Sequence, residues 1–332
     1  MTGSYDIEVS NSSIKYKIHI NRNITLIKGM SGTGNTTLID MISSFNKDSK
    51  YSGIYVKSRV SCYVMSDIDE DMMAKECIIF IDENATCIRR ATIAEYIGKI
   101  EAYIVIASRE DLRLKSNSDK RYGYLAIDVA AILELKLVGV DKYTGVHINE
   151  TSRMYMWNGK HKANLNNYDM ILCEDKKSGY ELWEIVADWY KIECETSNGN
   201  GSILSDIVNK LINNYNVIMV ADGAGFGAFM ALAMAIIESN NGRTAIILPT
   251  SFEYMILRSG EVDGVRDDLL YYPEKYADSK RYKSLERFFK AELSRLTIHD
   301  YEPYIKSKLP IRFRKENAVK KIIEPYVEID NN

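Results

Sequence analysis

Short apolar runs separated by polar, loop-forming segments predict several β-strands in the N-terminal third of the chain. Alternating apolar and polar residues at 5–9 and 14–20 predict two antiparallel strands. The apolar run 24–27 predicts a buried strand, and the pattern at 36–44 predicts a helix after it. Further strands are expected at 53–56, 61–65, 77–81 and 102–107.

A regular alternation of strands and helices begins near residue 168. Apolar runs predict strands, and segments with helical periodicity separate them: the strands are expected at 169–173, 191–195, 216–220 and 244–248, and the helices at 180–189, 203–213 and 228–239. This order is typical of a parallel sheet with helices on its faces. Beyond residue 252 the chain becomes helical and charged, and a helix is expected at 284–296.

The segment after the strand at 24–27 matches the phosphate-binding pattern G-x-x-x-x-G-K-[ST], except that Asn35 occupies the lysine position. In such a loop backbone N–H groups surround the phosphates, and the hydroxyl binds Mg²⁺. The missing charge is worth about 4 kcal/mol at about 4 Å and an effective dielectric constant of about 20, before desolvation. We therefore expect weakened nucleotide binding and hydrolysis. The expected nucleotide-binding residues are Gly29, Ser31, Gly32, Thr33, Gly34, Asn35, Thr36 and Thr37. The alternative is a glycine-rich turn that only caps the helix.

Two acidic residues follow the apolar run 77–81, as in a Walker B strand. Such a buried parallel strand brings an acidic side chain to a magnesium site at its carboxyl end. We expect Asp82 to hold Mg²⁺ together with Thr36. Glu83 is expected to orient or deprotonate the attacking water, as a catalytic residue.

These segments resemble the ATPase domains of the ABC, SMC and OLD-type group over roughly residues 1–135. The resemblance implies ATP and Mg²⁺ as ligands, and a sensor that faces the γ-phosphate at Ser108, where many relatives carry a histidine. Arg109 either supplies part of the missing lysine charge or is an exposed residue at the strand end. The loop and Asp82 are too close in sequence to accommodate the helical subdomain that bears the ABC signature. Because this group commonly dimerises around ATP, a homodimer is a further expectation.

The first and third strands of the second series end in acidic residues, Glu174 and Asp222. This placement resembles a Toprim domain, the metal-binding fold of topoisomerases, primases and OLD-type nucleases, over about residues 165–255. The resemblance implies that Glu174 and Asp222 bind the metal and take part in catalysis. Ala224 stands at the second acid of the Asp-x-Asp pair and cannot ligate Mg²⁺. Asp175 could contribute, although neighbours on an extended strand point in opposite directions.

Two other interpretations of the segment after Asp222 stay open. The sequence Gly223-x-Gly225-x-x-Ala228 after a strand matches the G-x-G-x-x-A dinucleotide fingerprint. Against a dinucleotide site, no acid ends the next strand near residue 248 to bind a ribose. The remaining interpretation is a tight glycine-rich turn without chemistry.

Composition narrows the function classes. A chain of 332 residues with 46% hydrophobic and 27% charged residues indicates a globular protein large enough for two domains. The net charge of −3 disfavours a globally basic nucleic-acid binder. Five cysteines lack the C-x-x-C spacing of zinc sites. Without a signal segment or a long apolar run, we expect a cytoplasmic protein that does not enter a membrane.

Basic residues are concentrated in the segment 304–323, with Tyr304 and Phe313 interleaved. The only acid among them is Glu316, and the basic residues are Lys306, Lys308, Arg312, Arg314, Lys315, Lys320 and Lys321. This pattern predicts either a surface that follows nucleic-acid phosphates or a solvated basic helix.

The sequence therefore predicts an α/β protein in three consecutive parts: a three-layer P-loop NTPase domain at 1–140, a Toprim-like parallel α/β domain at 141–255, and a helical, basic C-terminal extension at 256–332. This order resembles the OLD family in miniature, which couples ATP binding to metal-dependent nuclease action. The expected function is ATP binding coupled to metal-dependent action on nucleic acid, with weakened hydrolysis. The alternative is an inactive binding or regulatory protein that keeps both folds.

Overall fold

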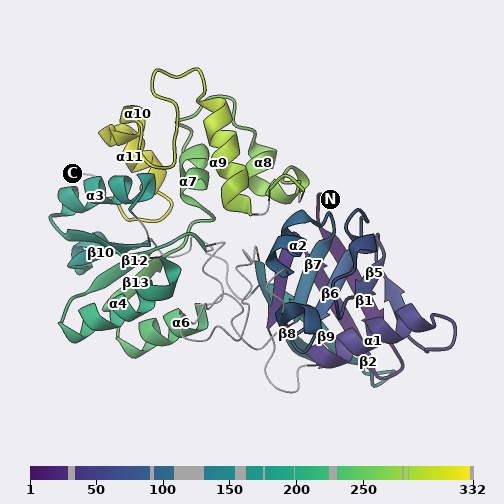
Figure 1. Ribbon diagram of the computed structural model, residues 1–332. Helices are drawn as coiled ribbons and strands as arrows, with labels where there is room; N and C mark the ends of the chain where they lie inside the picture. The colour runs from purple at the N-terminus through teal and green to yellow at the C-terminus, as the bar shows by residue number, and fades with distance from the viewer. Residues whose placement is uncertain are drawn as a thin grey trace. The chain divides into compact units, whose positions relative to one another are not determined.

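The computed structural model divides the chain into two compact units that are not contiguous in sequence (Figure 1). The first unit comprises Met1–Met154 and Pro273–Ser284, and the second comprises Tyr155–Tyr272 and Leu285–Asn332. Residues 140 and 255, where we expected domain boundaries, both lie away from the ends of these units. The structure describes residues 1–28, 34–89, 93–107, 131–153, 162–174, 176–197, 199–223, 230–278, 280–282 and 284–329.

The first unit is built on a nine-stranded mixed sheet with the order β4-β1-β2-β9-β8-β3-β7-β6-β5. The strands are β1 (Tyr5–Ser10), β2 (Ile14–Ile20), β3 (Ile24–Lys28), β4 (Tyr55–Lys57), β5 (Cys62–Val64), β6 (Ile78–Asp82), β7 (Tyr103–Ala107), β8 (Ala131–Val140) and β9 (His147–Arg153). All seven strands expected from the N-terminal part of the sequence are present, with ends that differ by up to two residues.

Five neighbouring strands, β8, β3, β7, β6 and β5, run parallel to one another. Residues 78–81 of β6 and all of β7 are buried, as expected for parallel strands covered on both faces. That burial explains why both strands read as continuous apolar runs in the sequence. Because the five strands are parallel, their carboxyl ends lie along one edge of the sheet.

The remaining strands give the sheet its antiparallel part. β1 pairs antiparallel with β2 and β4, and alternating residues of β1 are buried. The hairpin of β8 and β9 joins the two parts, because β9 pairs parallel with β2 and β8 pairs parallel with β3. The sequence pattern did not predict this hairpin, and it extends the first unit beyond residue 140.

Two helices of the first unit are α1 (Asn35–Lys47), which was expected, and α2 (Ile93–Lys99). α1 buries Leu38, Ile39, Met41 and Ile42 in the same apolar cluster as the strands. Short 3-10 helices lie at Glu70–Met72, Thr86–Arg89 and Pro273–Lys275. The last of these belongs to the returning segment, where Gly3 N donates to Glu274 O at 2.7 Å.

The second unit contains a fully parallel sheet with the order β11-β10-β12-β13. The strands are β10 (Met170–Cys173), β11 (Glu193–Thr196), β12 (Val217–Val220) and β13 (Thr244–Ile247), and the helices between and after them are α3 (Ser178–Tyr190), α4 (Asn200–Ile212), α6 (Met230–Ser239) and α7 (Phe252–Arg258). α3 lies on one face of the sheet, and α4 and α6 lie on the other (Figure 1). The predicted alternation of strands and helices is confirmed.

The C-terminal part of the chain packs into the second unit. Its helices are α8 (Asp267–Tyr271), α9 (Leu285–Leu296), α10 (Ile311–Arg314) and α11 (Glu316–Ile323). Elsewhere in the same unit, a 3-10 helix lies at Leu165–Asn167, before β10. α11 buries an apolar face of Ala318, Val319, Ile322 and Ile323. Beyond α11, Ala163 N donates to Tyr326 O at 2.9 Å, and Glu328 N donates to Ala163 O at 3.0 Å. Apolar side chains of the basic segment are thus part of the core of this unit.

Replacing Phe313 by alanine tests this packing. Phe313 is fully buried, so Phe313→Ala is expected to cost about 3–5 kcal/mol of unfolding free energy. Ile311 in the same helix is 61% exposed, and Ile311→Ala is expected to cost no more than about 0.5 kcal/mol. All three tryptophans belong to the second unit, so tryptophan fluorescence in a urea titration reports its unfolding. Equal effects of the two substitutions would contradict the assignment.

Candidate functional sites

The carboxyl edge of the first sheet carries the predicted nucleotide-binding residues that the structure describes. β3 ends at Lys28, and Gly34 is the N-cap of α1, with φ 88° and ψ 21°. This left-handed conformation favours glycine, as the loop pattern requires. Gly29, Ser31, Gly32 and Thr33 lie outside the described residues.

Tyr16 on β2 holds the end of the loop from within the core. Its hydroxyl donates to Gly34 O at 3.1 Å, and a Cβ atom at position 34 would lie 2.4 Å from that hydroxyl oxygen. Burial raises the pKa of Tyr16 to about 12, although a hydrogen bond with Thr37 opposes the shift. The hydroxyl therefore stays protonated at neutral pH. Sequence reasoning missed Tyr16, whose signal was its inward-facing place in the alternation of β2.

The first turn of α1 has the properties of an anion-binding helix end. No side chain caps the helix, and its first turn contains no acidic residue. Thr36 and Thr37 are exposed, whereas Asn35 Oδ1 is buried without a hydrogen-bond partner. The N–H groups and dipole of a helix N-terminus favour a phosphate. The part of the predicted loop that the structure describes is therefore compatible with nucleotide binding.

Asp82 lies at the same sheet edge, two strands away from β3. Ile27 and Asp82 both pair in register with Ala107 of the intervening strand β7. With strands about 4.8 Å apart, Asp82 lies about 10 Å across the sheet from the end of β3. Asp82 Oδ1 accepts hydrogen bonds from Asn84 N at 2.8 Å and Asn84 Nδ2 at 3.0 Å. Glu83 is half-buried next to it, and Ser108 and Arg109 lie outside the described residues.

The parallel register of the second sheet brings Glu174 and Asp222 together. Cys173 pairs with Val220, and Glu174 N donates to Val220 O at 3.1 Å. Asp222 N then donates to Glu174 Oε2 at 3.2 Å. Asp222 Oδ1 in turn accepts from Phe252 N, the first residue of α7, at 3.0 Å. Asp175 and Ala224 lie outside the described residues.

A pocket lies at this edge of the second sheet, and a third acid lines it. Glu174, Asp222 and Glu253 contribute to its wall, as do Lys177 and Lys306. Glu253 in the first turn of α7 is 0% exposed. Its Oε1 accepts from the Tyr304 hydroxyl at 2.9 Å, and its Oε2 is buried without a hydrogen-bond partner. Sequence reasoning missed Glu253, because its residue type and its position after a strand do not reveal its burial.

The donors around this pocket fit a hard divalent cation. Carboxylate oxygens are the ligands that Mg²⁺ and Mn²⁺ prefer, and Glu253 Oε2 is a buried oxygen that still lacks a partner. Among the described residues, no three His, Cys, Asp or Glu side chains already stand in a metal-binding arrangement. Glu174, Asp222 and Glu253 are the residues that would hold such an ion, and their side chains would have to move closer together to do so. An ion held there would polarise a phosphoryl oxygen and lower the pKa of a water bound to it.

Gly223 forms the tight turn that follows Asp222. Gly223 N donates to Pro249 O at 2.7 Å, and a Cβ atom at this position would lie 2.9 Å from both Leu248 O and Pro249 O. A side chain is therefore excluded by backbone atoms alone. Close packing explains Gly223 without a ligand, as the interpretation of a tight turn requires, while residues 224–229 lie outside the described part.

The basic segment 304–323 does not present a free cationic surface. Six of its seven basic residues form ion pairs with acids: Lys306 with Glu286, Lys308 with Glu302, Arg312 with Asp300, Arg314 with Glu181, Lys320 with Glu316 and Lys321 with Glu261. Tyr304 and Phe313 are buried and cannot stack on bases. This finding removes the features on which the expected phosphate-binding surface depended.

Comparison with known proteins adds no assignment to this geometry. No family model matches the sequence, and a search of curated proteins finds no significant match. In the described part of the chain, no helix combines the length and apolar character needed to cross a membrane.

Substitution of Gly223 tests the tight turn. Gly223→Ala is expected to lower the unfolding free energy of the second unit by about 1–3 kcal/mol, because the added Cβ meets two backbone carbonyls that cannot rotate away. Gly139→Ala, where a Cβ meets nothing within 4 Å, is the control and is expected to be neutral. Scanning calorimetry of both variants measures the difference. Full stability of Gly223→Ala would show that this turn is not closely packed.

Proposed function

We propose that this chain combines a nucleotide-binding P-loop unit with a Toprim-like unit that cleaves phosphodiester bonds in nucleic acid with a divalent metal. The observation that carries the proposal is the meeting of Glu174 and Asp222 with the buried Glu253 at one pocket. Glu174 and Asp222 follow the carboxyl ends of adjacent parallel strands, and open α/β sheets bind their ligands outside such strand ends. Glu174, Asp222 and Glu253 would hold the metal, and Glu174 would also assist proton transfer.

The nucleotide site of the proposal is at the edge formed by β3, β7 and β6. β3 continues through the loop into α1, and Asp82 lies two strands away, a span that a phosphate with its hydrated Mg²⁺ bridges. The consecutive strands β7 and β8 lie on opposite sides of β3, so β3 adjoins a topological switch point. Ligands of open α/β sheets bind at such points.

Asn35 determines how far this unit can act as an ATPase. An amide donates hydrogen bonds to a phosphate but brings no charge, and charge builds up on the phosphoryl group during transfer. The proposal is therefore ATP binding with weakened hydrolysis. Free cysteines at all five positions agree with a reducing, cytoplasmic environment.

The second candidate function is a binding or regulatory protein without turnover. It is favoured by two substitutions in the motifs, Asn35 and Ala224, and by the lack of a ready-made metal arrangement among the described residues. The two candidates differ in whether the acidic pocket cleaves nucleic acid.

Calorimetry of ATP binding with Mg²⁺ tests the nucleotide site. Asn35→Lys is expected to bind ATP about tenfold tighter or more, because a third of the roughly 4 kcal/mol charge interaction already gives that factor. Ser44→Lys adds the same charge at an exposed position near the other end of α1 and serves as the control. If neither the natural chain nor Asn35→Lys binds ATP, the nucleotide proposal is wrong. Equal gains in both variants would indicate a nonspecific charge effect.

Nicking of supercoiled DNA with Mn²⁺ or Mg²⁺ tests the second unit. We expect weak nicking that Glu174→Ala abolishes, since this substitution removes a metal ligand. Glu193→Ala is the matched control, because Glu193 is exposed at the amino end of β11, away from the carboxyl edge. Nicking that survives Glu174→Ala would place the activity elsewhere. Metal binding without nicking would favour the regulatory candidate.

A further inference from the structure

We propose that the C-terminal segment 302–314 completes the acidic pocket of the second unit, and that Tyr304 is the positioning residue that orients Glu253 toward a bound metal. The inference rests on the proposed metal site and gives the segment a role other than nucleic-acid binding. It is carried by one chain of hydrogen bonds that runs from α3 through Tyr304 to α7.

The Tyr304 hydroxyl is buried between two polar groups. It lies 2.9 Å from Glu253 Oε1 and 3.0 Å from Ser178 Oγ, and the residue is 2% exposed. A phenol has a single proton, and a carboxylate only accepts, so Tyr304 donates to Glu253 and accepts from Ser178.

The backbone of Tyr304 is fixed as firmly as its side chain. Tyr304 N donates to Thr297 Oγ1 at 3.0 Å, and Thr297 Oγ1 donates to Leu293 O in α9 at 2.8 Å. Thr297 is fully buried. On the other side, Ser178 N donates to Lys306 O at 3.1 Å. The hydroxyl is therefore held between the end of α9 and the start of α3.

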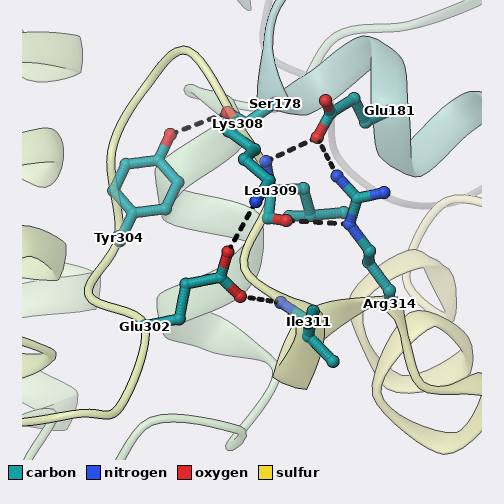
Figure 2. Close-up of polar contacts among 8 residues, drawn as sticks. All are labelled: Ser178, Glu181, Glu302, Tyr304, Lys308, Leu309, Ile311 and Arg314. Atoms are coloured by element: carbon teal, nitrogen blue, oxygen red, sulfur yellow. Dashed lines mark hydrogen bonds and ion pairs between the residues drawn. The ribbon is translucent and has the colours of Figure 1, made fainter.

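Hydrogen bonds of charged side chains connect the segment to α3 and also link residues within the loop (Figure 2). Glu181 Oε2 accepts from Leu309 N at 2.6 Å and from Arg314 Nη2 at 2.5 Å. Arg314 Nε donates to Leu309 O at 2.8 Å. Arg314 thus joins the loop to α3.

Glu302 closes the same loop from its other end. It accepts from Ile311 N at 2.7 Å and from Lys308 Nζ at 3.0 Å, as Figure 2 shows. The hydrogen bond from Ile311 N and the one from Lys308 hold the pKa of Glu302 below its ordinary value. The carboxylates of Glu181 and Glu302 therefore both hold the loop that carries Tyr304.

The two carboxylate oxygens of Glu253 differ in their hydrogen bonding. Oε1 is occupied by Tyr304, while Oε2 is buried without a partner in a side chain that lines the pocket. A buried acceptor without a partner is destabilising, and a cation at this position would give it a partner. Without the Tyr304 donor, the carboxylate loses its anchor and rotates between orientations.

Mn²⁺ binding to the full chain by calorimetry tests the inference, with nucleotide absent. Tyr304→Phe removes one oxygen and is expected to raise the Mn²⁺ dissociation constant about tenfold, the lower end of the effect typical of groups that orient metal ligands. Ser178→Ala removes the other hydrogen bond of the hydroxyl and is expected to change the constant less than about threefold. Tyr301→Phe, at a fully exposed tyrosine, is expected to change nothing.

A double-mutant cycle separates positioning from stability. If Tyr304 acts through Glu253, Tyr304→Phe has no further effect on Mn²⁺ affinity in a Glu253→Gln background, and a urea titration of each variant measures any loss of stability separately. If Tyr304→Phe lowers the urea midpoint but leaves the Mn²⁺ affinity unchanged, the inference about Tyr304 is wrong, while the proposed metal site still stands. If the natural chain fails to bind Mn²⁺, the proposed metal site and the inference both fall.

Discussion

Parallel strand pairing is the constraint on which both units depend. Parallel strands place their carboxyl ends, and the starts of the helices that follow, along a single edge of the sheet. In the first unit this brings the β3–α1 connection and Asp82 to one edge, and in the second it brings Glu174 and Asp222 to another. The same pairing requires both faces to be covered, which produces the continuous apolar strands. Fold and candidate chemistry thus have a common cause.

The sequence predicted those parts of the structure in which local pattern and topology agree. β6 is a short apolar run that ends in Asp82, and β10 is one that Glu174 follows; a parallel arrangement leaves little freedom in where these acids lie. The mixed α/β character and the parallel second sheet follow from the same runs. The identity of the candidate sites as P-loop and Toprim sites stays a prediction.

Long-range pairing explains what the sequence did not predict. The hairpin of β8 and β9 joins two parts of a sheet, and its neighbours β2 and β3 are distant in sequence. Glu253 is buried, and one of its oxygens accepts a hydrogen bond from Tyr304, which comes from a different part of the chain. The concentration of lysine and arginine at 304–323 was visible, but acids such as Glu181 and Glu261 that neutralise it lie far upstream. Charge counted along a segment therefore did not measure the charge exposed at the surface.

The return of residues 273–284 to the first unit has a consequence for the order in which the chain folds. Glu274 accepts from Gly3 N and pairs with Arg22, while Lys280 pairs with Glu101. During synthesis residues 1–154 are made well before residues 273–284. These contacts can therefore form only after the ribosome has translated residue 284. By then all four strands of the second sheet, which end at Ile247, have already been synthesised. The first unit therefore cannot be completed before most of the second unit has been translated. Until then it lacks its contacts with residues 273–284.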